Sequence, residues 1–198
     1  MTDTTTRRQQ MADAAITTLA QAGMRGLTHR AVDQTADLPE GSCSYYFRTR
    51  QALLQATVER LVEVDTADLA ARPAVLGQSA VPAEIAEAAA DVVRHWTTSA
   101  GERMRARYEL MLEAGRRPEL QAALDRARDH YHRLAENTLA AAGATDPATQ
   151  APLFIACLDG LVFRHLTGAD RLPASPETLN RTLLDLLHGF TRRPGSAT

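Results

Sequence analysis

Apolar and small residues recur at intervals of three and four positions along most of the chain, which is the spacing of one face of an α-helix. The first such stripe consists of Met11, Ala14, Ala15, Thr18, Leu19 and Ala22. Gly23 follows at the place where this helix would end. No segment of the sequence alternates apolar and polar residues as a half-buried strand does. The pattern therefore predicts an all-α protein with about nine helices.

A second, short helix is predicted directly after the first. Thr28 is a residue type that caps helix N-termini, because its hydroxyl can accept a hydrogen bond from an amide of the first turn. Leu27 and Val32 occupy the two positions of a hydrophobic staple around this cap. These signals predict a helix of about two turns over residues 29–36.

A tight turn and a third short helix come next. Residues 37–41 contain Pro39 and Gly41, which both interrupt helices. The turn leads into a brief predicted helix over residues 42–47, and Thr49 can cap a longer fourth helix. Two short helices joined by a turn and braced by a preceding helix have the layout of a helix-turn-helix, whose second helix enters the major groove of DNA.

The clearest change in composition lies at residues 70–82, where two prolines and a glycine interrupt the helical pattern. A boundary in helix four or in this segment divides the chain into two predicted domains. The first is a DNA-binding domain over residues 1–62, with its reading pair at about 28–47. The second covers residues 63–198.

Five further helices are predicted in the second domain. They cover about 82–99, 102–114 and 118–142, and the last two start at the cap-plus-proline pairs Asp146–Pro147 and Ser175–Pro176. Pro152 is the reason for expecting the eighth helix to become regular only around or after residue 150, because proline removes a helix hydrogen bond.

Composition limits the possible partners. The chain has 198 residues and a formal net charge of -2, and all 22 of its Lys and Arg residues are arginine. This balance excludes a polycation that coats nucleic acid without selectivity, so an anionic partner must meet a local patch. Cys43 and Cys157 lack metal-ligand spacing, which argues against a zinc finger or a disulfide scaffold. The sequence lacks a signal-peptide core and an apolar run of roughly 18 residues, so a soluble, cytoplasmic protein is expected.

The residue types around the predicted turn suit contacts with DNA. Small residues let the backbone approach a groove, hydroxyls can donate hydrogen bonds to base edges or phosphates, and guanidinium groups pair with phosphates. Residues 25–50 carry four arginines against three acids, a local charge of only +1, so affinity must come from geometry and from a dimer. The predicted DNA-binding residues are Thr28, His29, Gly41, Ser42, Ser44, Tyr45, Tyr46, Arg48 and Arg50.

The segment GLTHRAVDQTADLPEGSCSYYFRTRQALL, residues 26–54, resembles the N-terminal signature of the tetracycline-repressor (TetR) family of transcriptional regulators. Phe47 stands at the buried phenylalanine of that signature and Arg50 at its lysine. Three positions depart from it, where a tyrosine, a turn glycine and an alanine are replaced by Ser44, Asp37 and Asp33. The resemblance implies a homodimeric repressor that binds a palindromic operator in double-stranded DNA and releases it when a small-molecule inducer binds.

The resemblance also implies roles for the C-terminal helices. Their aromatic and methionine side chains suit an adaptable apolar pocket, although a stripe of methionine and aromatic residues at helical spacing is more often part of a core. The ligand-binding candidates are Trp96, Met104, Tyr108, Met111, Leu112, Tyr131 and Phe154. Two wide apolar stripes near the C-terminus are expected to form a four-helix bundle with a second copy, the alternative being the core of a monomer. The dimer-interface candidates are Leu158, Leu161, Val162, His165, Leu183, Leu187 and Phe190.

Two other classes of function are open at this point. A helical enzyme has little support, since the sequence has no glycine-rich phosphate loop, nucleophile elbow or catalytic pairing of histidine and carboxylate. A structural DNA-binding protein without a ligand would need a sealed core, and an activator would use the same reading residues as a repressor. No catalytic residue, metal site or cofactor is predicted. His130 and His132 cannot bind one metal ion, because they are two positions apart on a helix and point in different directions.

Overall fold

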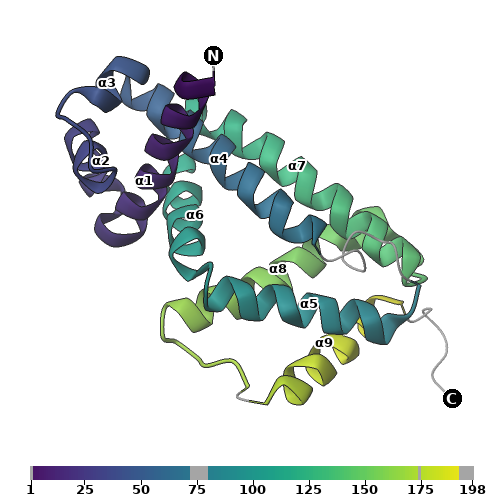
Figure 1. The fold of residues 1–198 in the computed structure, drawn as a ribbon. Helices are drawn as coiled ribbons and strands as arrows, with labels where there is room; N and C mark the ends of the chain where they lie inside the picture. The colour runs from purple at the N-terminus through teal and green to yellow at the C-terminus, as the bar shows by residue number, and fades with distance from the viewer. Residues whose placement is uncertain (1, 72–79, 174, 192–198) are drawn as a thin grey trace, which may run out of the picture. The chain divides into compact units, whose positions relative to one another are not determined.

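The computed structural model describes residues 2–71, 80–173 and 175–191, and these ranges contain nine helices and no strand (Figure 1). The helices are α1 Thr2–Gly26, α2 His29–Thr35, α3 Ser42–Tyr46, α4 Arg50–Ala70, α5 Pro82–Thr97, α6 Gly101–Ala114, α7 Pro118–Ala141, α8 Pro147–Leu166 and α9 Pro176–Thr191. The all-α prediction is confirmed. Residues 72–79 of the predicted break in composition lie outside the described residues. Within the described ranges, every helix is too short or too polar to cross a bilayer.

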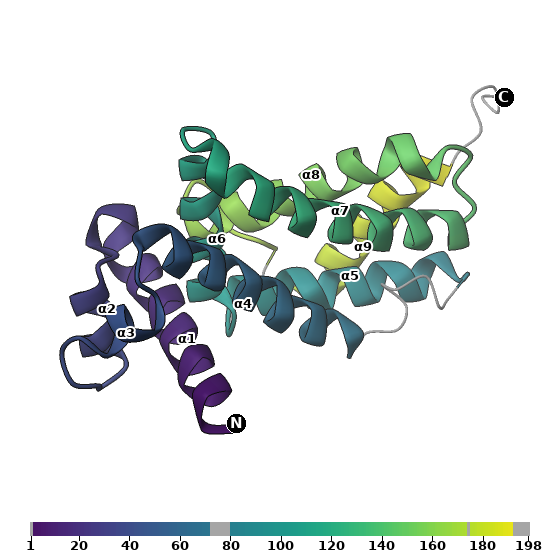
Figure 2. The same cartoon turned by 90° about the horizontal axis from the view of Figure 1, so that it is seen from above.

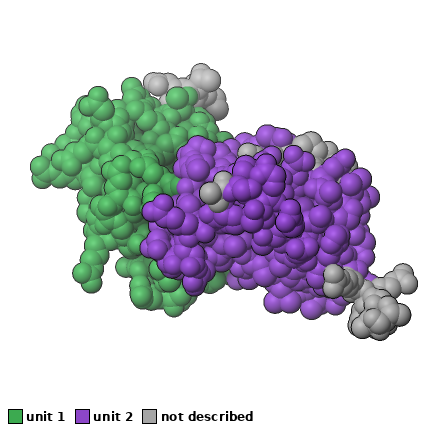
Figure 3. All heavy atoms as spheres, turned by 90° about the horizontal axis from the view of Figure 1, so that it is seen from below, with its two compact units in different colours: residues 1–65, 100–127 green, residues 66–99, 128–198 purple. Residues whose placement is uncertain are grey.

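The chain forms two compact units, which Figure 3 colours separately. The first contains residues 1–65 and 100–127, and the second contains residues 66–99 and 128–198. Both α4 and α7 therefore contribute residues to each unit. The predicted domains 1–62 and 63–198 were divided by function, into a DNA-binding part and the rest of the chain. That functional division stays a prediction.

The first unit is built around a continuous hydrophobic core. Figures 1 and 2 show α2 and α3 packed beside α1, and α6 also lies against α1. The core includes Leu19, Val32, Phe47, Leu53 and Leu110, which are almost completely buried and come from different segments of the unit. Burial of this apolar surface, at about 25 cal/mol per Å², is the main stabilising force within the unit.

Local signals fix where the first helices begin and end. Gly23 has φ 64° and ψ -174°, so it breaks the helical path inside α1 at the predicted place. The hydroxyl of Thr28 accepts a hydrogen bond from the Ala31 amide at 3.1 Å, and both staple residues, Leu27 and Val32, are fully buried. The predicted cap and staple of α2 are confirmed.

The second unit packs α5 against α8 and α9. The buried stripe of α5, which includes Ile85, Val92 and Trp96, belongs to the same unit as the buried leucines Leu179, Leu183 and Leu187 of α9. Polar and aromatic contacts fix the register at the edges of this core. Arg94 donates to the Asn180 side chain at 3.3 Å, and the rings of Phe154 and Phe190 meet edge to face at 5.7 Å.

The eighth helix starts at the predicted Asp146–Pro147 pair, but the expectation that it becomes regular only around or after residue 150 is wrong. Helix α8 begins at Pro147 and continues through Pro152, with the Asp146 carboxylate accepting from the Thr149 amide at 3.4 Å. Pro147 is at the first helical position, where a missing N–H has no cost. Pro152 lies one turn further on, where its missing N–H leaves the Ala148 carbonyl without its usual helix partner.

Replacing Pro152 with alanine should therefore stabilise the protein. The side chain is exposed, so little burial is given up, and the gain should be about 1 kcal/mol and at most the roughly 3 kcal/mol that proline costs in a helix interior. Urea denaturation monitored by circular dichroism measures the change. Pro147→Ala is the matched control and should give no gain, so equal effects of the two substitutions would contradict this account.

Candidate nucleic-acid interface

Helices α2 and α3 are joined by a turn whose backbone conformation is tightly specified. The Leu38 amide donates to the Asp33 carbonyl at 2.9 Å and the Asp37 amide to the Gln34 carbonyl at 3.2 Å, which together form a Schellman motif at the end of α2. Asp37 has φ 53°, a left-handed conformation that aspartate tolerates better than most residues. Asp37 therefore adopts a left-handed conformation at the position where the family signature has a turn glycine.

A buried carboxylate links the two helices across this turn. Asp33 is only 2% exposed, and its two oxygens accept hydrogen bonds from the Gly41 amide at 2.9 Å and the Cys43 amide at 2.6 Å. These two amides precede and open α3, so Asp33 of α2 serves as a side-chain cap of the third helix. It holds α3 at a fixed distance from α2.

The sequence pattern marks Asp33 only as a departure from the family signature and does not predict this role. A signal was present, because Asp33 lies beside Val32 on the inward side of a short amphipathic helix. An acid at such a position needs buried hydrogen-bond donors. Backbone amides of a following turn can supply them.

Cys43 packs inward, as a small apolar residue would. Its side chain is fully buried, and burial, with a smaller contribution from the Asp33 carboxylate, raises the pKa of the thiol to about 12. The thiol is therefore protonated at neutral pH. Its role on α3 is to fasten the helix to the core of the first unit.

The outer side of α3 is exposed and polar. Tyr45 is 78% exposed, and Ser44 and Arg48 are also exposed. The Ser42 hydroxyl donates to the Pro39 carbonyl at 2.6 Å and the Ser44 hydroxyl to the Gly41 carbonyl at 2.9 Å. In this conformation the two serines can accept hydrogen bonds from a partner, whereas the sequence analysis expected them to donate.

Two aromatic residues mark the edge of this surface. The rings of Tyr45 and Tyr46 meet edge to face with centroids 5.1 Å apart, and Tyr46 is half-buried against the core. Arg8 of α1 donates to the Tyr46 carbonyl at 3.0 Å and lies 4.6 Å from the centre of the Phe47 ring. Arg8 is a cation beside α3 that was not among the residues predicted to contact DNA.

His29 and Arg50 point into the protein and brace the ends of the motif. The His29 ring nitrogen Nε2 lies 2.6 Å from the Phe47 carbonyl. The Arg50 guanidinium donates to the Met24 carbonyl at 2.5 Å and also to the Leu27 carbonyl. The structure therefore gathers the predicted residues of 28–50 in one motif, but it gives these two side chains partners inside the chain.

The candidate ligand-binding residues do not belong to one compact unit. Trp96, Tyr131 and Phe154 are buried in the second unit. The other four lie on α6 of the first unit, where Met104 is buried, Tyr108 is half-buried, and Met111 and Leu112 are 45% and 63% exposed.

The candidate dimer residues divide in a similar way. Four of them, Leu158, Val162, Leu183 and Leu187, are already buried within the single chain. Leu161, His165 and Phe190 are half-buried, and the exposed side of α8 instead carries Leu153 and Phe163. The prediction for these seven residues stays untested, and the exposed side of α8 is the surface that a second copy could reach.

Substituting Asp33 should loosen α3 without abolishing the fold of the first unit. Asp33→Ala leaves the Cys43 amide buried without an acceptor, which costs about 1–3 kcal/mol, and Asp33→Asn should cost less because one acceptor oxygen remains. We expect amide hydrogen exchange at Gly41 and Cys43, followed by NMR, to accelerate about tenfold or more in Asp33→Ala. Glu40→Gln, an exposed change in the same turn, is the control. Equal exchange in the two variants would show that the carboxylate does not hold the helix.

Known proteins match parts of the chain. Residues 80–193 match the family of tetracyclin repressor-like C-terminal domains. The HTH-type transcriptional regulator BetI of Paraburkholderia phymatum is 38% identical over 56 residues, which are 28% of this chain and 29% of that protein. The chain thus matches less than a third of the length of these curated relatives.

Solved structures match over nearly the whole length. The multidrug binding protein EbrR, solved with imidazole, is 30% identical, with a TM-score of 0.69 over 96% of this chain and 97% of its own. A TetR-family member from Streptomyces coelicolor A3 is 31% identical, with a TM-score of 0.70 over 91% of this chain and 97% of its own. The chain therefore belongs to the TetR family of transcriptional regulators.

Proposed function

We propose that this protein is a homodimeric, ligand-responsive repressor that binds a palindromic DNA operator. The observation that carries the proposal is the fixed helix-turn-helix with its outer polar side, where Ser44, Tyr45 and Arg48 are exposed and Cys43 and Phe47 are buried. Residues 1–62 would supply the DNA contacts. Residues 63–198 would supply ligand binding and dimerisation.

In this proposal α3 enters the major groove and α2 crosses the phosphate backbone. Gly41, Ser42 and Ser44 allow close approach, and the serine oxygens accept hydrogen bonds from base amino groups. The phenol groups of Tyr45 and Tyr46 donate to phosphates at the rim.

The charged and capping residues divide into two roles. Arg48 has no ion-pair partner among the described residues, so its guanidinium is available to a phosphate. Thr28 lies at the N-terminus of α2, which in this proposal faces the phosphate backbone of the DNA. His29 and Arg50 contribute to DNA binding indirectly in this proposal, because they hold the backbone at Phe47 and at Met24 and Leu27 in place.

A dimer is needed because the local charge is small. A single reading head neutralises few phosphates, whereas two heads fixed about 34 Å apart, or a multiple of that distance, engage successive major grooves together. We propose that a second copy covers the exposed side of α8, where Leu153 and Phe163 flank the small residues Ala156 and Gly160. Small residues at such positions allow two helices to approach closely.

The inducer is proposed to be a small aromatic molecule. EbrR, a multidrug binding protein, has been solved with ethidium, proflavin and malachite green. In the present chain the buried aromatic residues Trp96, Tyr131 and Phe154 of the second unit would line the pocket. If an inducer weakens operator binding by some factor, the operator must weaken inducer binding by the same factor.

Operator binding tests the proposal directly. Arg48→Ala should weaken binding to a fluorescent promoter fragment about tenfold and reduce the salt dependence, by about 0.9 in the log–log slope for each phosphate that is no longer neutralised. Fluorescence anisotropy across a series of salt concentrations gives both quantities. Arg133→Ala, which removes an exposed arginine from α7, should leave both unchanged. If Arg48→Ala leaves the operator affinity unchanged, Arg48 is not part of the interface. If the wild-type protein binds the promoter and a scrambled fragment with equal affinity, the proposal is wrong.

Gly160 offers a test of the dimer. A Cβ at this position meets no atom within 4 Å in the single chain, so Gly160→Gln should leave the protomer folded while obstructing a helix packed against α8. We expect analytical ultracentrifugation to show a shift from dimer toward monomer, with the helical circular dichroism spectrum retained. Ala140→Gln on the exposed side of α7 is the control. A variant at Gly160 that dimerises as the wild type does would place the interface elsewhere.

A further inference from the structure

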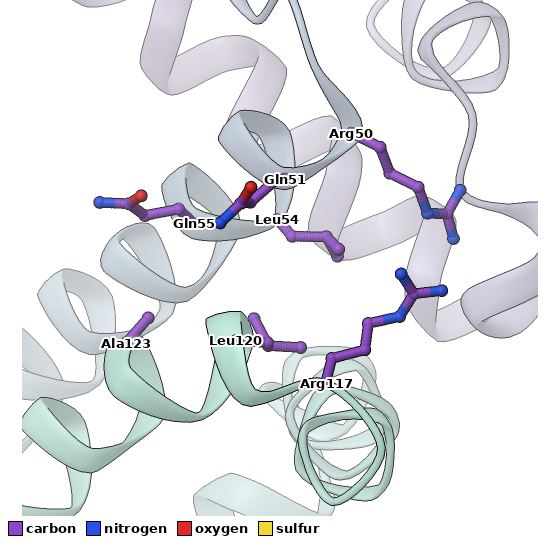
Figure 4. A pocket seen from close by; sticks show the side chains of 7 residues that line it. All are labelled: Arg50, Gln51, Leu54, Gln55, Arg117, Leu120 and Ala123. Carbon is purple, nitrogen blue, oxygen red and sulfur yellow. The ribbon is translucent and has the colours of Figure 1, made fainter.

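Two neighbouring pockets of the first unit share the same pair of arginines. Arg50, at the start of α4, and Arg117, just before α7, line a small pocket of about 40 Å³ whose lining includes Leu54 and Leu120. Figure 4 shows the two guanidinium groups pointing toward one another at one end of this pocket. The same two residues also line a larger groove of about 710 Å³ that extends to the end of α1 and to α6.

This larger groove carries an excess of positive charge. Its lining includes the arginines 25, 50, 116 and 117 and the glutamates 109 and 113. Four positive charges against two negative ones leave +2. Guanidinium groups stay protonated at all physiological pH values, so this excess cannot be relieved by loss of a proton.

The partners of each arginine show where the excess lies. Arg116 and Arg117 both pair with Glu113, and the hydrogen bond from Arg117 lowers the pKa of that carboxyl, which is therefore ionised at neutral pH. Arg50 instead donates to two neutral carbonyls, those of Met24 and Leu27. Within the described part of the chain no carboxylate lies within ion-pair distance of Arg50, so its charge is not neutralised.

Glu109, the other glutamate of the groove lining, contacts the backbone at the end of α1. Its carboxylate accepts from the Met24 amide at 3.3 Å and lies within 3.8 Å of the position that a Cβ on Gly23 would take. It therefore supplies a hydrogen-bond acceptor where Gly23 interrupts α1. Among the described residues, neither Glu109 nor Glu113, the two glutamates of the groove lining, forms an ion pair with Arg50.

We propose that this arginine groove, defined by Arg25, Arg50, Arg116 and Arg117, binds a small multivalent oxyanion. Guanidinium groups present paired N–H donors that match two oxygens of a phosphate or a carboxylate, and an anion between Arg50 and Arg117 relieves their mutual repulsion. The smaller pocket has room only for water, whereas the groove has room for a phosphate monoester or a tricarboxylate. This site is separate from the reading surface of α3, and the inference does not rest on the proposed function.

Calorimetric titration of the purified, full-length protein tests this site without DNA. Inorganic phosphate and citrate are titrated separately, with ionic strength held constant by chloride. Binding should be at least tenfold weaker in Arg117→Gln and weaker by a smaller factor in Arg116→Gln, whose side chain is more exposed. Arg126→Gln removes a charge from the exposed side of the adjoining helix, α7, and should bind as the wild type does.

Each outcome of the titration decides a point. Binding of phosphate alone identifies a phosphate site, binding of citrate alone identifies a carboxylate site, and binding of both supports a general oxyanion site. Failure of both probes to bind, or equal affinities in Arg117→Gln and the wild type, would overturn the inference. Circular dichroism establishes that each variant is folded, and if Arg117→Gln is not, Arg116→Gln carries the comparison with Arg126→Gln.

Discussion

The contact between the Asp33 carboxylate and the amides of Gly41 and Cys43 determines where α3 lies relative to α2. Helix α3 has only five residues, and helices shorter than about 12–15 residues are marginal in water on their own. Its position must therefore come from contacts with the rest of the first unit. Asp33 fixes the first turn, Cys43 and Phe47 fasten one side to the core, and His29 meets the carbonyl that follows the last turn.

Charged side chains in the first unit recur as partners of turn backbone. Arg8 binds the Tyr46 carbonyl, Arg50 binds the carbonyls of Met24 and Leu27, and Glu109 accepts from the Met24 amide. Each joins a helix to the end of another helix or to the turn beside it. Hydrogen bonds that involve a charged group are stronger than neutral ones, so these turns are held more firmly than their lack of regular structure suggests. The same contacts reduce the number of arginines that remain for DNA.

Much of the fold could be predicted from the sequence, because short-range rules determine where most helices begin and end. The cap at Thr28, the breaks at Gly23 and Gly41, and the proline at the start of α7 all act within one turn of the chain. Pro152 wrongly indicated that α8 becomes regular only around or after residue 150, because one missing hydrogen bond does not outweigh the burial of residues such as Ala151 and Phe154. The candidate site was predicted less completely, since side-chain direction depends on tertiary contacts. The spacing of residues 28–50 located the motif, yet it could not show that Arg50 and His29 bind backbone carbonyls inside the chain, nor that Asp33 caps a helix eight and ten positions away. Apolar periodicity likewise identified the inward sides of α8 and α9, but burial within one chain and burial between two chains give the same pattern.

The composition of the first unit has a consequence for how this family member can be altered or recombined. Its hydrophobic core takes Ala106, Leu110 and Ala114 from α6 and Leu120 and Ala123 from α7, all distant in sequence from the helix-turn-helix. A fragment that ends near residue 62 would leave the apolar sides of α1 and α4 open to water. The part of the chain that can be transplanted as a folded piece is therefore larger than the part that resembles a DNA-reading motif, and a chimaera must carry α6 and the first half of α7 with it.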